Sequence, residues 1–160
     1  VDLQSKAWDM ALYTAIHTSQ AGATQVLLDA GACPTQAAAY VLLLKGDASP
    51  ASPHSPQALR CLTACLQAGA QPDSVLMLAA AFGGDGGAVT ALLDAGADPQ
   101  PAAPLLIASF LGHTPVVQAL LRRTAPGHPY LQAAIHAAEE GERVVTLEVL
   151  RAAAAGHAGA

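Results

Sequence analysis

VTALLDAGADP, residues 89–99, is the stretch that decides the fold of this chain. Val89, Leu92 and Leu93 are spaced so that they share one face of a short helix, and such a face needs a packing partner. Gly96 can end this helix because glycine adopts the left-handed backbone conformation without steric cost, and a proline soon follows. The stretch therefore predicts a short helix with one apolar face and a fixed end.

The same pattern recurs along the chain. The strings LLDAGACP (residues 27–34) and CLQAGAQP (residues 65–72) are close copies of it. A period of about 28 residues is typical of solenoids, in which each repeat buries its apolar face against its neighbours. The longest interval contains residues 47–57, a proline-rich stretch that predicts an insertion without regular structure. The last apolar residue of the pattern recurs after 38, 27, 28 and 29 residues, at Leu28, Leu66, Leu93, Leu121 and Leu150.

Composition favours close-packed helices over a sheet. Apolar residues make up 52% of the chain but aromatic residues only 4%, and alanine and leucine have high helix propensity. We expect five pairs of short antiparallel helices in a single array over residues 1–155, followed by a disordered tail at 156–160. Asp73 or Ser74, and Thr114, are predicted to cap the helices that follow them. Such pairs have no core of their own and must stack on each other.

Charge and hydropathy argue against two classes of partner. The net charge is −5 and the 7 Lys and Arg residues are scattered, whereas nucleic-acid binding needs a clustered basic face. The longest apolar run, residues 75–82, is too short to span a bilayer. Three cysteines are too few for a disulfide framework, so we expect a reducing, cytoplasmic environment. Because the chain starts without methionine and without a signal peptide, we expect it to be a piece of a longer protein.

No pattern of catalytic or metal-binding residues accompanies these repeats. Cys61 and Cys65 lie four residues apart on one helical face, which would hold a metal ion only if two more ligands converged there. No second Cys pair or HxxxH sequence is present, and small cores use free cysteine as an apolar residue. The glycines at 83–87 lack the Lys-Ser/Thr of a phosphate-binding loop. We therefore expect no metal, no cofactor and no catalytic residue.

The stretch PLLIASFLGHTPVVQALL, residues 104–121, resembles the ankyrin repeat, whose consensus reads roughly TPLHxAAxxGHxxVVxxLLxxGADxN. The copies before and after it match at fewer positions, and the resemblance covers about four fifths of the chain. It implies an all-α ankyrin-type solenoid of about five repeats. The matching positions of this copy are Pro104, Leu105, Ala108, Gly112, His113, Val116, Val117, Leu120 and Leu121.

Two departures from the ankyrin pattern lead to further expectations. The family period is about 33 residues, and Gly96 and Pro104 are only 8 residues apart. The missing residues are those of the β-hairpin finger, so we expect truncated hairpin loops and a recognition surface displaced toward the inner helices. The threonine and histidine of TPLH are nearly absent, so we expect stability to depend on apolar stacking.

The resemblance also implies a partner-binding surface, because in ankyrin repeats the two residues after the Ala-Ala pair of the inner helix face the concave groove. Phe82 and Phe110 are the only phenylalanines, and exposed aromatic residues are typical of interface hot spots. We expect them at the same repeat position, offset by one residue. The alternative is that the shortened loops fold down and bury both rings. The candidate partner-binding residues are Leu44, Lys45, Ala81, Phe82, Phe110, Leu111, Glu139 and Glu140.

These features predict a non-catalytic module that captures a partner protein on its concave surface. The glutamates of the last repeat are expected either to contact basic residues of that partner or to form a solvated helix end. The alanine-rich composition and the shortened repeats resemble the ankyrin domains of bacterial secreted effectors that modify host caspases. That resemblance implies a host protease such as a caspase as partner, and the host cytosol as location. The alternative is a structural scaffold or a self-assembling repeat array.

Overall fold

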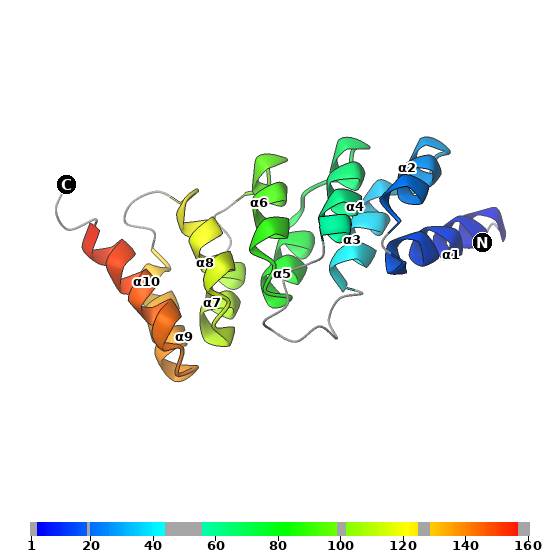
Figure 1. Ribbon diagram of the computed structural model, residues 1–160. Helices are drawn as coiled ribbons and strands as arrows, with labels where there is room; N and C mark the ends of the chain where they lie inside the picture. Colours follow the sequence, from blue (N-terminus) through cyan, green and yellow to red (C-terminus); the bar gives the residue numbers. More distant parts are fainter. Residues whose placement is uncertain (1–2, 19, 44–55, 99–101, 125–128, 157–160) are drawn as a thin grey trace.

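Helices joined by turns make up the part of the chain that the structure describes, which is residues 3–18, 20–43, 56–98, 102–124 and 129–156 of a computed structural model (Figure 1). No strand occurs in these residues, so the prediction of an all-α fold is confirmed. The helices are α1 (Leu3–His17), α2 (Ala21–Asp29), α3 (Pro34–Leu43), α4 (Pro56–Gln67), α5 (Ser74–Phe82), α6 (Gly86–Asp94), α7 (Ala102–Leu111), α8 (Thr114–Leu121), α9 (Leu131–Glu140) and α10 (Val144–Gly156).

Consecutive helices form antiparallel pairs that stack side by side into two layers. The first-helix layer contains α1, α3, α5, α7 and α9, and the second-helix layer contains α2, α4, α6, α8 and α10 (Figure 1). The main contacts of each helix are with the other helix of its pair and with the same-layer helices of the adjacent pairs. This arrangement is a solenoid, as the repeat pattern predicts.

Glycines end the second helices at the predicted positions. Gly31, Gly69 and Gly96 have φ angles of 102°, 98° and 98°, which only glycine adopts without strain. After Gly96 the backbone N–H of Ala97 donates to the carbonyl of Leu92 at 2.9 Å, which closes the end of the helix. The repeated AGA sequence therefore ends the second helix in the first three pairs.

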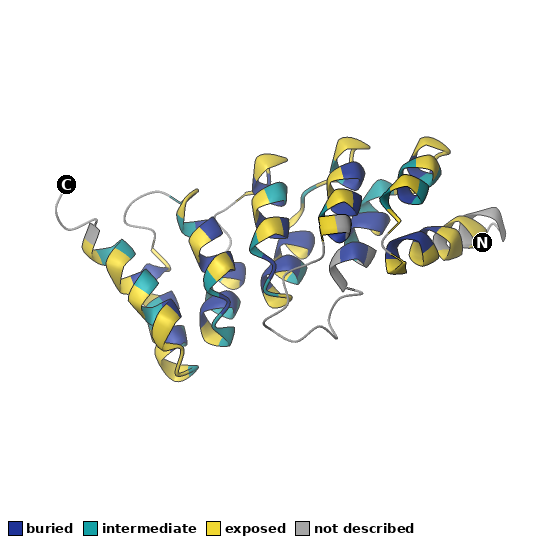
Figure 2. Ribbon diagram, viewed as in Figure 1, coloured by how far each residue is buried: buried dark blue, intermediate teal, exposed yellow. Residues whose placement is uncertain are grey.

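The core lies between the two layers and runs the length of the array. Figure 2 shows buried residues on the helix faces that meet each other and exposed residues on the outward faces. Leu62, Leu92 and Leu120 are fully buried at this boundary, each from a different helix of the second layer. Every pair thus buries its apolar faces by contact with its neighbours.

The connections between pairs are short where the structure describes both ends. α6 ends at Asp94 and α7 begins at Ala102, which leaves residues 95–101 to join one pair to the next. The predicted proline-rich insertion at 47–57 overlaps the start of α4, which begins at Pro56, and residues 47–55 lie outside the described part. α10 extends to Gly156, the first residue of the predicted tail. None of the described helices is long and apolar enough to cross a membrane.

Candidate functional site

The turns after the first helices define equivalent positions in successive pairs. Gly84 and Gly112 have φ angles of 74° and 81°, and Glu142 has a φ angle of 55° at the corresponding place. Counting back from these residues puts Phe82 and Phe110 at one repeat position with no offset. The expected offset of one residue is therefore wrong, because Gly83 and Leu111 are equivalent and the turns have the same length.

Both phenylalanine rings are at the surface. Phe82 is 66% exposed and Phe110 is 48% exposed, so the alternative in which shortened loops bury both rings is excluded. Ala81, in contrast, is fully buried, and its side chain cannot contact a partner. One residue along a helix rotates the side chain by about 100°, so Ala81 points into the core while Phe82 is exposed. Leu111 is half-buried.

Phe82 belongs to a longer line of exposed apolar side chains on α5. Val75 and Leu78 precede it at helical spacing, so the three residues share one face of the helix. On α7 the equivalent line contains the half-buried Leu106 and the exposed Phe110. We call these five residues the apolar ridge. Leu44 and Lys45, the candidates from the preceding pair, lie outside the described residues.

The backbone beneath each phenylalanine is held by the next helix pair. The Nε2 atom of His113 lies 3.1 Å from the carbonyl oxygen of Phe82, and the Nε atom of Arg143 donates to the carbonyl oxygen of Phe110 at 3.2 Å. His113 and Arg143 are equivalent residues, directly after the turns. The neighbouring repeat therefore holds the backbone at both phenylalanines in place.

Sequence reasoning missed these hydrogen bonds between pairs. It identified His113 only as a position that matches the ankyrin consensus, and it assigned stability to apolar stacking. Thr114, which was predicted to cap α8, places its Oγ1 2.8 Å from Oγ1 of Thr146 in the next pair, while the N-cap residue of α8 is His113, without a side-chain cap bond. The recurrence of a donor side chain directly after the turn, at His113 and Arg143, was the pattern that could have predicted the contact.

The contribution of His113 to stability depends on pH. Burial lowers the pKa of His113 below its ordinary value; the hydrogen bond to Phe82 opposes this effect, and the positive charge of Arg143 adds to it. An unfolded histidine binds a proton below pH ~6.5, whereas the folded protein resists protonation until a lower pH. Between these two pH values the unfolded state holds more protons. The stability that His113 contributes is therefore complete above pH ~6.5, the unfolded pKa, and falls as the pH drops toward the folded pKa.

We therefore expect His113→Gln to flatten the pH dependence of stability. The glutamine amide can still donate to the carbonyl of Phe82 but does not titrate. Between pH 7.5 and pH 5.5, roughly the range around the ordinary histidine pKa, the melting temperature of the wild type should fall further than that of the variant. Thermal melting followed by circular dichroism at both pH values measures the difference. Identical losses in the two proteins would show that His113 does not contribute.

The last repeat presents charged side chains at the equivalent surface. Glu139 and Glu140 are both exposed, but both have partners on the protein itself. Arg151 donates to Glu139 at 2.8 Å, and Nε2 of His136 lies 3.5 Å from Glu140. The surface thus changes from apolar on α5 and α7 to charged on α9.

The two neighbouring cysteines lie in the core. Cys61 and Cys65 are fully buried, and the hydroxyl of Thr24 lies 3.7 Å from the Cys61 sulfur. Burial raises the pKa of Cys65 to about 12, and the proximity of Cys61 adds to this, so the thiolate form needed for attack or for metal binding is disfavoured. Within the described residues there is no group of three or more His, Cys, Asp or Glu side chains that could hold a metal ion.

Comparison with known proteins assigns the fold. No family model and no curated protein matches the sequence. Among solved structures, the chain is similar to the human ASB11 ankyrin repeat domain, with a TM-score of 0.67 and 20% sequence identity. The match covers 87% of this chain and 66% of that domain, so the chain spans just under two thirds of its length. The chain has the ankyrin-repeat fold.

Proposed function

We propose that the apolar ridge binds another protein, with Phe82 and Phe110 as its anchors and without chemistry of its own. Ankyrin-repeat folds generally serve as protein-interaction modules. The observation that most supports the proposal is the exposure of both phenylalanines, 66% and 48%, at one repeat position on adjacent helices. Large apolar rings exposed to water are unfavourable, and their burial in an interface with another protein would lower the free energy.

The geometry suits a partner with two apolar contacts. Adjacent packed helices lie about 10 Å apart, which sets the spacing between the two anchors. Because His113 and Arg143 hold the carbonyls of both residues, only the side chains have to be ordered on binding. Hot spots of this kind are typically aromatic residues near the centre of an interface.

At a finer level, we propose that the chain is the substrate-recruiting domain of a larger bacterial effector that modifies a host protein such as a caspase, in the host cytosol. The alanine-rich composition and the shortened repeats, which resemble those of such effectors, support this proposal. Purified caspases are the direct test. Binding of the chain to at least one caspase, lost in the ridge variant described below, is expected; absence of binding to any of them would remove this assignment and leave the ridge proposal intact.

The double variant Phe82→Ala, Phe110→Ala tests the ridge. Loss of two aromatic hot spots is expected to weaken partner binding by at least about 30-fold, while the melting temperature stays close to that of the wild type because both residues lie at the surface, about half exposed or more. The matched control is Val144→Ala, Val145→Ala, which removes two apolar side chains that are 67% and 65% exposed on α10.

Proteins captured by the immobilised chain from a cell extract, identified by mass spectrometry, provide the binding measurement. The ridge variant should lose the proteins that the wild type and the control variant retain. Retention of the same proteins by the ridge variant would contradict the proposal, as would a large fall in its melting temperature.

Self-assembly is the second candidate function, since an exposed apolar ridge can also pair with that of another copy. Light scattering distinguishes the two. A monomer over the micromolar range argues against a self-assembling array, and a dimer that the ridge variant abolishes would favour it.

A further inference from the structure

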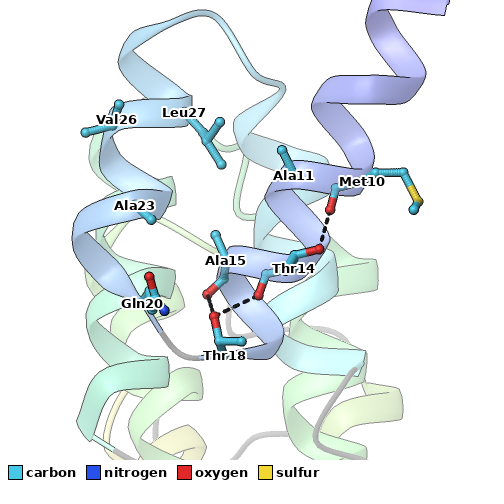
Figure 3. A pocket seen from close by; sticks show the side chains of 9 residues that line it. All are labelled: Met10, Ala11, Thr14, Ala15, Thr18, Gln20, Ala23, Val26 and Leu27. Carbon is cyan, nitrogen blue, oxygen red and sulfur yellow. Dashed lines mark hydrogen bonds between the residues drawn. The ribbon is translucent and has the colours of Figure 1, made fainter.

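The outward face of the first helix pair contains an open apolar groove. Side chains from both α1 and α2 line it, as Figure 3 shows. Most of the lining is aliphatic, and in Figure 3 the later helices lie behind the first pair, on the side away from the groove. The lining residues are Met10, Ala11, Thr14, Ala15, Thr18, Gln20, Ala23, Val26 and Leu27.

These lining residues have counterparts in the interior pairs. The N–H of Gln20 donates to the carbonyl of Ala15 at 2.9 Å, and the N–H of His113 donates to that of Ala108 at 2.8 Å in the same turn geometry. The two pairs are therefore in register, and each lining residue can be compared with the residue that occupies its place farther along the array.

In the interior pairs, which have another pair ahead of them, several of these places are buried. Leu27 is half-buried, whereas its counterparts Leu92 and Leu120 are 0% and 1% exposed. Ala23 is half-buried, and its counterpart Val116 is fully buried. The groove thus has the composition of an interface between repeats and is continuous with the interfaces that hold the array together.

The register between the pairs also gives Gln20 a polar counterpart in later pairs. It stands at the position from which His113 and Arg143 bond to a carbonyl at the end of the preceding first helix. Its side chain makes no cap hydrogen bond to α2. A glutamine amide is also a donor, so the groove offers the same polar contact, in the same place, to an ankyrin-type helix ahead of α1.

The opposite end of the array is built differently. Glu139 and Arg151 occupy the places that Ser109 and Leu121 hold in the pair before, and the two charged side chains pair at 2.8 Å. Terminal repeats of a solenoid need a polar outer face of this kind. Because burial of this ion pair would cost desolvation, the C-terminal end of a second copy is a poor occupant for the groove.

We propose that a further helix pair of the same repeat type, joined to this chain ahead of residue 1, packs into the groove between α1 and α2. The array then continues toward the N-terminus, and Gln20 donates to the last turn of the added first helix. The fold supports this inference, and it does not depend on the proposed function.

The substitution Ala11→Glu tests the proposal when it is made in two chains, the longer natural polypeptide and residues 1–160. Ala11 is exposed here, but its counterparts Leu76 and Pro104 are buried, so a charge at this place is tolerated only if nothing packs on it. The matched control is Ala152→Glu, because Ala152 and its counterpart Arg122 are both exposed.

In the longer polypeptide, Ala11→Glu is expected to lower the melting temperature by about 5 °C or more, and in residues 1–160 by about 2 °C at most. Ala152→Glu should lower the melting temperature by about 2 °C at most in both chains. Amide exchange in α1 and α2 of the unmutated protein should be at least about tenfold slower in the longer polypeptide.

Equal effects of Ala11→Glu in the two chains, or unchanged exchange in α1 and α2, would overturn the proposal. A natural polypeptide without residues ahead of this chain would overturn it too. So would a dimer of residues 1–160 that Ala11→Glu dissociates, because a second copy would then occupy the groove.

Discussion

Leu92→Ala is expected to lower the free energy of unfolding by about 3 kcal/mol, the middle of the range for truncating a buried leucine. Leu92 is fully buried on α6, a helix that packs between α4 and α8. A cavity left there cannot collapse easily because α4 and α8 hold α6 from both sides. Equilibrium unfolding in urea measures the loss.

Leu27→Ala is the matched control for this substitution. Leu27 occupies the same register position in the first pair but is only half-buried, so its truncation in residues 1–160 is expected to cost about 1 kcal/mol. Equal losses at the two positions would mean that stacking on both sides does not determine the stability of a pair.

Gly141→Ala is expected to cost about 3 kcal/mol, at the upper end of the range for inserting an atom into a packed site. The φ angle of Gly141 is −78°, which alanine adopts freely, so backbone strain plays no part. The added Cβ would overlap the carbonyl oxygen of Phe110, which belongs to the backbone of α7 and which Arg143 holds in place. Relief of the overlap requires α7 and α9 to separate.

Gly22→Ala provides the control for Gly141→Ala. A Cβ at Gly22 meets nothing within 4 Å, and the residue lies inside α2. Alanine there is expected to stabilise the protein by about 0.5 to 1 kcal/mol, because glycine is unfavourable within a helix. The two variants should therefore change the melting temperature in opposite directions. Stabilisation by both would show that the close approach of α7 and α9 is not needed.

Local sequence determines most of this fold, because each repeat is specified by short-range features. Leucine pairs place an apolar face on α2, α6 and α8, and the glycine of AGA ends α2, α4 and α6 at Gly31, Gly69 and Gly96. Asp73 caps α5 as expected, with its Oδ1 accepting from the N–H of Leu76 at 2.9 Å. Such features act over four or five residues, so a sequence shows them directly.

Contacts between repeats were harder to predict, because they depend on how one pair sits on the next. Whether Phe82 and Phe110 are buried or exposed depends on how neighbouring pairs pack, and the sequence left both outcomes open. The same packing buries Ala81, which the ankyrin resemblance had placed on the binding surface. The bonds from His113 and Arg143 to the phenylalanine carbonyls likewise join residues about thirty positions apart.

Removal of the last helix pair tests the central claim, that each pair is held by its neighbours alone. A chain that ends at Thr124 lacks α9 and α10 but keeps every contact among α1 to α6. If stacking is local, the far-ultraviolet circular dichroism of this chain should fall only in proportion to the residues removed, and its melting should remain cooperative. Loss of helical structure throughout the remaining residues would contradict the claim, since it would mean that the helices share one common core.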